Sequence, residues 1–263
     1  MLESEKKRIV ELDFIRGILI LLMLLQHFFY FLYRYIYGEI WKKEYLSGGL
    51  IEFGNFLNDA LYIKPYCRIA MSIGWFIFFC MSGINFHFSK NNKKRVMYLL
   101  IFFLSYYFIC FLLQNFTLYP LTLNFGIFLG YALFILLFDF IKIFPFWVSI
   151  VLCIAFLILS ICSYTLNFNL EVSPFRWFNF SQKNKMDYLD QWYLCPSIFF
   201  YSLGYIMGKL LYKEKKSKLP FLEKKIFIPV LFFGKNSKYI YLGNLVFFPV
   251  VFIFATYIIN GGL

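Results

Sequence analysis

Arg16 and His27 are the residues of this sequence whose types and spacing best suit the transfer of a chemical group. They stand eleven positions apart in one apolar segment, and eleven steps of about 100° return an α-helix to within roughly 20° of its starting direction. Both side chains therefore project from one face of one helix, separated by a rise of about 16 Å. A guanidinium can hold the phosphates of a donor. A neutral imidazole can take a proton from an acceptor hydroxyl or amine, or carry an acyl group itself.

Asp13 and Gly17 lie beside Arg16 and complete this constellation. Asp13 is three positions before Arg16, which allows an ion pair on one helix face, and Gly17 lets another backbone come close. Ionisable residues at membrane depth are costly and are functional candidates by default. The spacing also allows a structural interpretation, in which Arg16 is an interfacial anchor paired with Asp13 and His27 only hydrogen-bonds between helices.

The composition of the chain predicts the membrane helices that would position these residues. Of the 263 residues, 61% are hydrophobic and only 15% are charged, whereas a soluble chain is about half apolar and a quarter charged. The apolar runs are roughly 17–25 residues long, which is enough to cross a bilayer. We predict an all-α, polytopic transmembrane helix bundle that forms a single domain over residues 1–263. About seven spans are expected, near residues 15–37, 69–88, 96–115, 118–138, 143–166, 192–212 and 239–259.

The distribution of Lys and Arg predicts a cytoplasmic N-terminus. Sixteen of these residues fall on the side of the N-terminal tail and eight on the opposite side, a bias that marks the cytoplasmic loops. The net charge of +12 is therefore interpreted as a topology signal, and no nucleic-acid partner is expected. The apolar stretch 226–233 is too short to cross and contains Pro229, so an interrupted, interfacial or re-entrant segment is predicted there.

Four blocks of the sequence resemble the heparan-α-glucosaminide N-acetyltransferase catalytic-domain family. The first holds the signature Glu-Leu-Asp-Phe-x-Arg-Gly, an apolar run, and then a His followed by aromatic residues. The blocks span residues 8–30, 75–95, 190–211 and 231–249. The resemblance implies a multi-pass protein of the bacterial inner membrane that moves an acetyl group from cytosolic acetyl-CoA to a sugar amine or hydroxyl near the outer leaflet. Arg16, held by Asp13, would then bind the donor, and His27 would be the base or nucleophile.

The chain departs from the family pattern in its histidines. The last block of the family usually carries a His where this chain has Asn244, and a middle block ends in His where this chain has Leu129. His27 and His87 are the two histidines of the sequence, and His87 has no counterpart in the motifs. A second hypothesis is therefore a non-catalytic relative that binds or transports a glycan or lipid precursor.

Asp190 and Asn244 are further candidates for the acceptor side of the site. Asp190 begins the sixth predicted span, where its carboxylate could orient an acceptor or act with His27, or could simply be a solvated loop charge. Asn244 could bind substrate, although an amide cannot do acid–base work.

A basic run before the third predicted span is a further candidate for the donor side. Its side chains could hold the phosphates of acetyl-CoA, or could only fix topology and meet anionic lipid. Membrane lipid and a sugar or glycolipid acceptor are the expected partners, and no metal-ligand cluster is recognised. The cationic residues proposed for the donor are Lys93, Lys94 and Arg95.

Overall fold

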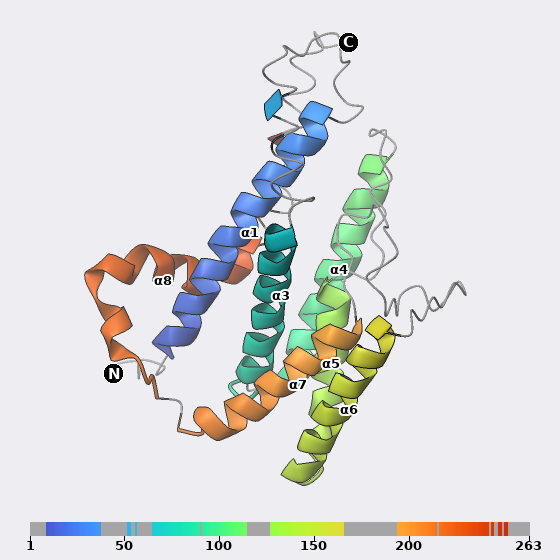
Figure 1. Ribbon diagram of the computed structural model, residues 1–263, viewed down its shortest axis with the longest axis vertical. Coiled ribbons are helices and arrows are strands. Elements are labelled where there is room, and N and C mark those ends of the chain that lie inside the picture. The colour runs from blue at the N-terminus through green and yellow to red at the C-terminus, as the bar shows by residue number, and fades with distance from the viewer. Residues whose placement is uncertain are drawn as a thin grey trace. The chain divides into compact units, whose positions relative to one another are not determined.

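The described part of the chain is helical in the computed structural model (Figure 1). No strand occurs among the described residues, so the predicted all-α class holds there. The described residues are 9–37, 52–53, 56, 65–89, 91–114, 127–165, 194–214, 216–241, 243–244, 247–248 and 250–251. The elements are α1 (Val10–Tyr37), α3 (Pro65–Phe86), α4 (Asn92–Gln114), α5 (Ile127–Ile141), α6 (Phe146–Thr165), α7 (Leu194–Leu211), the 3₁₀ helices η4 (Pro220–Glu223) and η5 (Lys225–Phe227), and α8 (Ile228–Lys235).

Six of the predicted spans overlap the helices α1, α3, α4, α5, α6 and α7, although residues 118–126 of the fourth span lie outside the described residues. Much of the seventh predicted span, 239–259, also lies outside them. Among the described residues, Val10–Phe29 of α1 is the one stretch long and apolar enough to cross a membrane by length and composition. Three shorter apolar helical stretches follow it, namely Ile73–Phe86, Phe128–Ile141 and Phe146–Cys162. The count of seven spans and the cytoplasmic N-terminus remain predictions.

Pro229 does not interrupt the short apolar stretch, contrary to the sequence-based expectation. It lies in the first turn of α8, which runs without a break over Ile228–Lys235. A proline is tolerated at this position because the first backbone N–H groups of a helix have no partner within the helix. Pro229 therefore begins a helix, and the predicted interfacial position of that helix is untested.

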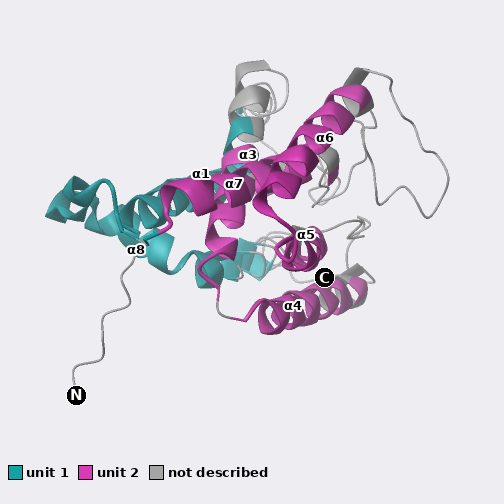
Figure 2. Cartoon of the chain, turned by 90° about the horizontal axis from the view of Figure 1, so that it is seen from below, with its two compact units in different colours: residues 1–75, 214–263 teal, residues 76–213 magenta. Residues whose placement is uncertain are grey.

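The chain divides into two compact units, which are coloured separately in Figure 2. Unit 1 contains Met1–Trp75 and Glu214–Leu263, so it joins α1 to the C-terminal segment, and unit 2 contains Phe76–Lys213. The core of unit 2 is aromatic. Tyr201 of α7 is completely buried, and its ring centroid lies 5.0 Å from that of Phe138 and 5.5 Å from that of Phe134, both of α5. Aromatic rings at such distances contribute packing energy beyond the area they bury.

Glycines let α3 and α7 touch through their backbones within unit 2. A Cβ atom added at Gly204 would overlap the backbone of Cys80, and one added at Gly83 would overlap the carbonyl of Tyr201. Gly204 and Gly208 are four positions apart, a pattern of small residues that lets two helices pack closely. A Cβ atom at Gly208 would also lie 2.7 Å from the ring of His87. His87 forms a 2.7 Å hydrogen bond from Nε2 to the carbonyl oxygen of Tyr205, so it fastens the end of α3 to α7.

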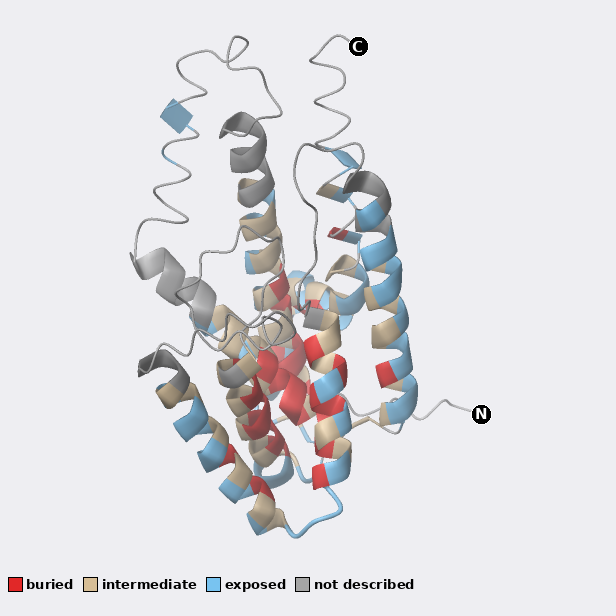
Figure 3. Cartoon of the chain, turned by 90° about the vertical axis from the view of Figure 1, so that its right-hand side faces the viewer, coloured by how far each residue is buried: buried red, intermediate tan, exposed pale blue. Residues whose placement is uncertain are grey.

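Apolar residues are exposed in regular stripes on the helices of unit 2. Figure 3 colours the exposed residues pale blue. Met97, Ile101, Leu104 and Phe108 of α4 follow one another at helical spacing, and each is more than half exposed. On α6 a second stripe is formed by Trp147, Val151, Ile154, Ile158 and Ile161. Extended exposed apolar surfaces commonly contact another protein or a membrane.

Replacement of Gly204 by alanine tests the packing of α3 on α7. The added methyl group meets backbone that cannot move aside, so Gly204→Ala should lower stability by about 1–3 kcal/mol. Gly74→Ala is the matched control in α3, because its Cβ atom would meet only a Leu19 methyl group at 3.9 Å. Thermal unfolding in detergent should show a lower midpoint for Gly204→Ala only. Equal midpoints for the two variants would contradict this packing.

Candidate functional site

Two glycines bring α1 and α8 into backbone contact within unit 1. A Cβ atom at Gly17 would overlap the carbonyl oxygen of Val230, and one at Gly234 would overlap the carbonyl oxygen of Asp13. The prediction that Gly17 admits a second backbone is therefore confirmed. The ring of Phe14 also packs edge-on against that of Phe227, with 5.3 Å between centroids. α8 thus crosses the N-terminal half of α1 at the level of Asp13 and Gly17.

Asp13 and Arg16 form the ion pair predicted from their spacing. Nη1 of Arg16 lies 2.6 Å from Oδ1 of Asp13. The Asp13 side chain is 10% exposed and the Arg16 side chain is 27% exposed. A buried carboxylate needs such a partner, because an unpaired charge at this depth would be strongly destabilising. The arrangement fixes the guanidinium on α1 and leaves part of its surface open.

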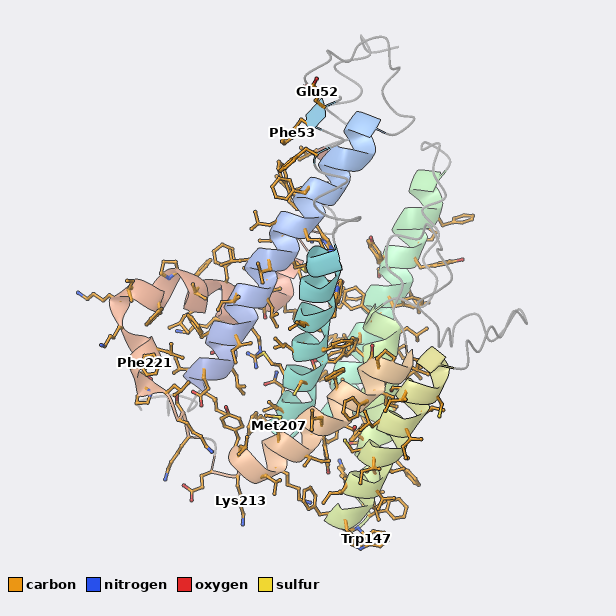
Figure 4. The ribbon with its side chains drawn as sticks, in the orientation of Figure 1. Glu52, Phe53, Trp147, Met207, Lys213 and Phe221 are labelled. Atoms are coloured by element: carbon orange, nitrogen blue, oxygen red, sulfur yellow. The ribbon has the colours of Figure 1, made fainter. Side chains whose placement is uncertain are left out.

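Glu11 is a buried residue of α1 whose contacts reasoning from the sequence missed. Its carboxylate is buried and accepts hydrogen bonds from the hydroxyl of Ser217 and, at 2.8 Å, from the backbone N–H of Lys218. These bonds hold the lysine-rich segment, residues 216–225, against the first turn of α1. η4, which contains Phe221 (Figure 4), also contacts α1. An acidic residue in the first turn of an apolar helix was the available signal, since carboxylates are favoured at helix N-termini.

His27 and Asn244 meet in space although 217 positions separate them in the sequence. Nδ2 of Asn244 lies 2.5 Å from Nδ1 of His27. Asn244 is 4% exposed, and its Oδ1 is buried with no hydrogen-bond partner in the described structure. The sequence nominated both residues for the site but gave no sign that they form a pair. One step along α1, the ring of Phe28 packs near that of Phe248, with 5.9 Å between centroids.

The exposed face of α1 lies opposite Arg16 and His27. Ile18, Leu22 and Leu25 form an exposed apolar stripe at intervals of four and three residues. At about 100° per residue, Arg16 and His27 point roughly 180° away from the centre of this stripe. The buried residues Leu12, Asp13 and Ile20 of α1 lie on that same opposite side, whereas buried Glu11, in the first turn, projects on the side of the stripe. The candidate site therefore faces the protein interior of unit 1 and not its apolar outer surface.

Of the remaining predicted site residues, three belong to unit 2 and one lies outside the described residues. Lys93, Lys94 and Arg95 lie in the first turn of α4, which belongs to unit 2. The guanidinium of Arg95 donates a 3.3 Å hydrogen bond to the hydroxyl of Tyr131 and lies over its ring. Asp190 falls outside the described residues. Among the residues that are described, no group of three His, Cys, Asp or Glu side chains could hold a metal ion.

Comparison with known protein families identifies the chain. The family model "Heparan-alpha-glucosaminide N-acetyltransferase, catalytic" matches residues 49–246, about three quarters of the sequence. This match includes Asn244, whereas Arg16 and His27 precede it. No curated protein and no solved structure matches the chain. On the extent of the family match, the chain belongs to the heparan-α-glucosaminide N-acetyltransferase catalytic-domain family.

Proposed function

We propose that this protein is a membrane acyltransferase that moves an acetyl group from cytosolic acetyl-CoA to an amine or hydroxyl, of a sugar or glycolipid, near the outer leaflet. One observation carries the proposal. Arg16 and His27 share the buried side of α1, and each contacts a second polar side chain, Asp13 for Arg16 and Asn244 for His27. Family membership supports the transferase class. A purely structural pair of polar residues would not need a fixed cation and an imidazole in line on one helix.

The exposed apolar stripes support a multi-pass location in the membrane. They occur on α1, α4 and α6, where large aliphatic and aromatic side chains face outward at helical spacing. Lipid chains are the surroundings in which such surfaces are stable. The excess of Lys and Arg on the side of the N-terminal tail supports a cytoplasmic N-terminus.

The donor is proposed to bind at the N-terminal end of α1. Arg16 offers a guanidinium with five N–H groups, which can meet a carboxylate and a phosphate together. Glu11 holds Lys218 and its lysine-rich surroundings beside the same end of the helix, which supports a site for the phosphates of coenzyme A. Lys93, Lys94 and Arg95 are proposed as a second contribution from α4.

His27 is proposed to act at the point where the acetyl group is transferred from acetyl-CoA to the acceptor. The acceptor nitrogen or oxygen bonds to the carbonyl carbon of the thioester, the carbon–sulfur bond breaks, and the sulfur leaves as a thiolate. His27 either takes the proton of the acceptor and returns it to the thiolate, or first carries the acetyl group itself. Asn244 beside His27, and Asp190, which precedes α7 in the sequence, are proposed to orient the acceptor.

Removal of the imidazole tests this role of His27. Purified His27→Ala protein should cleave acetyl-CoA at least about 100-fold more slowly than wild type, because general acid–base catalysis contributes roughly 10²–10⁴-fold. His87→Gln is the matched control, since an amide side chain can still donate to the carbonyl of Tyr205. Release of free thiol reports the rate. A rate that survives His27→Ala would exclude His27 from the chemistry.

Removal of the guanidinium tests the donor site. Arg16→Gln should weaken acetyl-CoA binding by about tenfold or more, because a hydrogen bond to a charged group contributes about 1.5–3 kcal/mol. Lys142→Gln is the matched control, since Lys142 and Asp139 form an ion pair of the same spacing in unit 2. The double variant Asp13→Asn with Arg16→Gln removes both charges and so leaves no carboxylate unpaired. Calorimetric titration with acetyl-CoA should show weak binding for both Arg16 variants and unchanged binding for Lys142→Gln.

The same measurements distinguish the second hypothesis. A wild-type protein that neither binds nor cleaves acetyl-CoA would have kept the family's fold without its chemistry. In that case the role of a non-catalytic relative, which binds or transports a glycan or lipid precursor, would replace the transferase role.

A further inference from the structure

The hydrogen bond between Asn244 and His27 fixes which ring nitrogen carries the hydrogen. An amide nitrogen has hydrogens and no available lone pair, so Nδ2 of Asn244 is the donor of the 2.5 Å contact. Nδ1 of His27 must then be the acceptor. A neutral imidazole has one ring hydrogen, and with Nδ1 accepting it resides on Nε2.

This tautomer leaves His27 without a nitrogen that can act as base or nucleophile. The lone pair of Nδ1 is occupied by Asn244, and Nε2 already bears the hydrogen. In the Ser-His-Asp triad, replacing the orienting carboxylate by an amide holds the imidazole in the wrong tautomer and lowers kcat by about 10⁴-fold. Asn244 corresponds to the amide that replaces the orienting carboxylate, because it too contacts Nδ1 of the histidine.

The other end of the same amide could support the opposite tautomer. Oδ1 of Asn244 is buried and has no hydrogen-bond partner in the described structure. An unsatisfied buried acceptor lowers the stability of a protein by about 1–3 kcal/mol. A half-turn about the Cβ–Cγ bond exchanges Oδ1 and Nδ2 within almost the same volume. Oδ1 would then accept a hydrogen from Nδ1, and the lone pair of Nε2 would become free.

We propose that Asn244 is a positioning residue that sets the tautomer of His27, and that the arrangement in the structure is a resting state with the hydrogen on Nε2. Turnover through His27 then requires the half-turn of the amide. This consequence for turnover rests on the proposed function, whereas the assignment of the ring hydrogen does not. A carboxylate at position 244 can only accept, so Asn244→Asp should hold the hydrogen on Nδ1 permanently.

Nitrogen NMR of the full-length wild-type protein in detergent tests the assignment directly. With ¹⁵N in the histidine rings and Asn side chains, a scalar coupling across the hydrogen bond should join Asn244 Nδ2 to His27 Nδ1. The ring hydrogen should lie on Nε2 in alkaline buffer, where the ring is neutral. His87→Gln assigns the signals, because the sequence has two histidines. A wild-type ring hydrogen on Nδ1, or no coupling to Asn244, would overturn the proposal.

Asn244→Asp and Asn244→Leu complete the test. In Asn244→Asp the ring hydrogen should move to Nδ1, and acetyl-CoA turnover should rise about tenfold or more over wild type. Asn244→Leu has a similar shape and no polar end, so it releases Nδ1 without giving it an acceptor, and turnover should rise less than in Asn244→Asp. A ring hydrogen that stays on Nε2 in Asn244→Asp would overturn the proposal. If the hydrogen moves and turnover does not rise, the assignment stands and the base role of His27 in the proposed function fails.

Discussion

The backbone contact between α1 and α8 is the constraint on which the candidate site depends. It exists because Gly17 and Gly234 have no side chains at the points where Val230 and Asp13 of the opposite helix approach. With α8 fixed across the N-terminal half of α1, the chain that follows it reaches the other half. There Asn244 meets His27. The site is therefore assembled from the two ends of the sequence, and the spacing of residues on α1 alone does not create it.

The charges in the N-terminal half of α1 are stable in an apolar helix because each is matched locally. Asp13 and Arg16 neutralise each other over 2.6 Å, and Glu11 receives hydrogen bonds from the hydroxyl of Ser217 and the backbone N–H of Lys218. These partners differ in kind. The ion pair lies within one helix and would form wherever α1 goes, whereas the bonds to Glu11 form only when the lysine-rich segment is in place. The folding of the C-terminal segment and the burial of Glu11 therefore stabilise each other.

Hydropathy located the helices, because burial in lipid or protein demands long apolar runs. It could not show which helices pack against one another. The first span was predicted to begin at residue 15, whereas α1 begins at Val10, because Glu11 and Asp13 lower the local hydropathy without breaking the helix. Pro229 was interpreted as an interruption, since a proline in isolation does not reveal that it occupies a first turn. The ion pair of Asp13 and Arg16 was predictable because spacing within one helix fixes it. The contact of His27 with Asn244 was not, because the sequence does not say which helices are neighbours.

The choice of an amide beside His27 balances burial against tautomer control. A carboxylate at position 244 would fix the ring hydrogen on Nδ1, but it would place a negative charge at a position where the present side chain is only 4% exposed. Burying an amide is far less costly than burying a charge. The amide, however, has a donor end and an acceptor end of nearly equal size, so it can support either tautomer. With one histidine in this site and an amide beside it, the reactivity of the imidazole becomes a matter of amide orientation, which an acceptor group binding near Oδ1 or Nδ2 could itself decide.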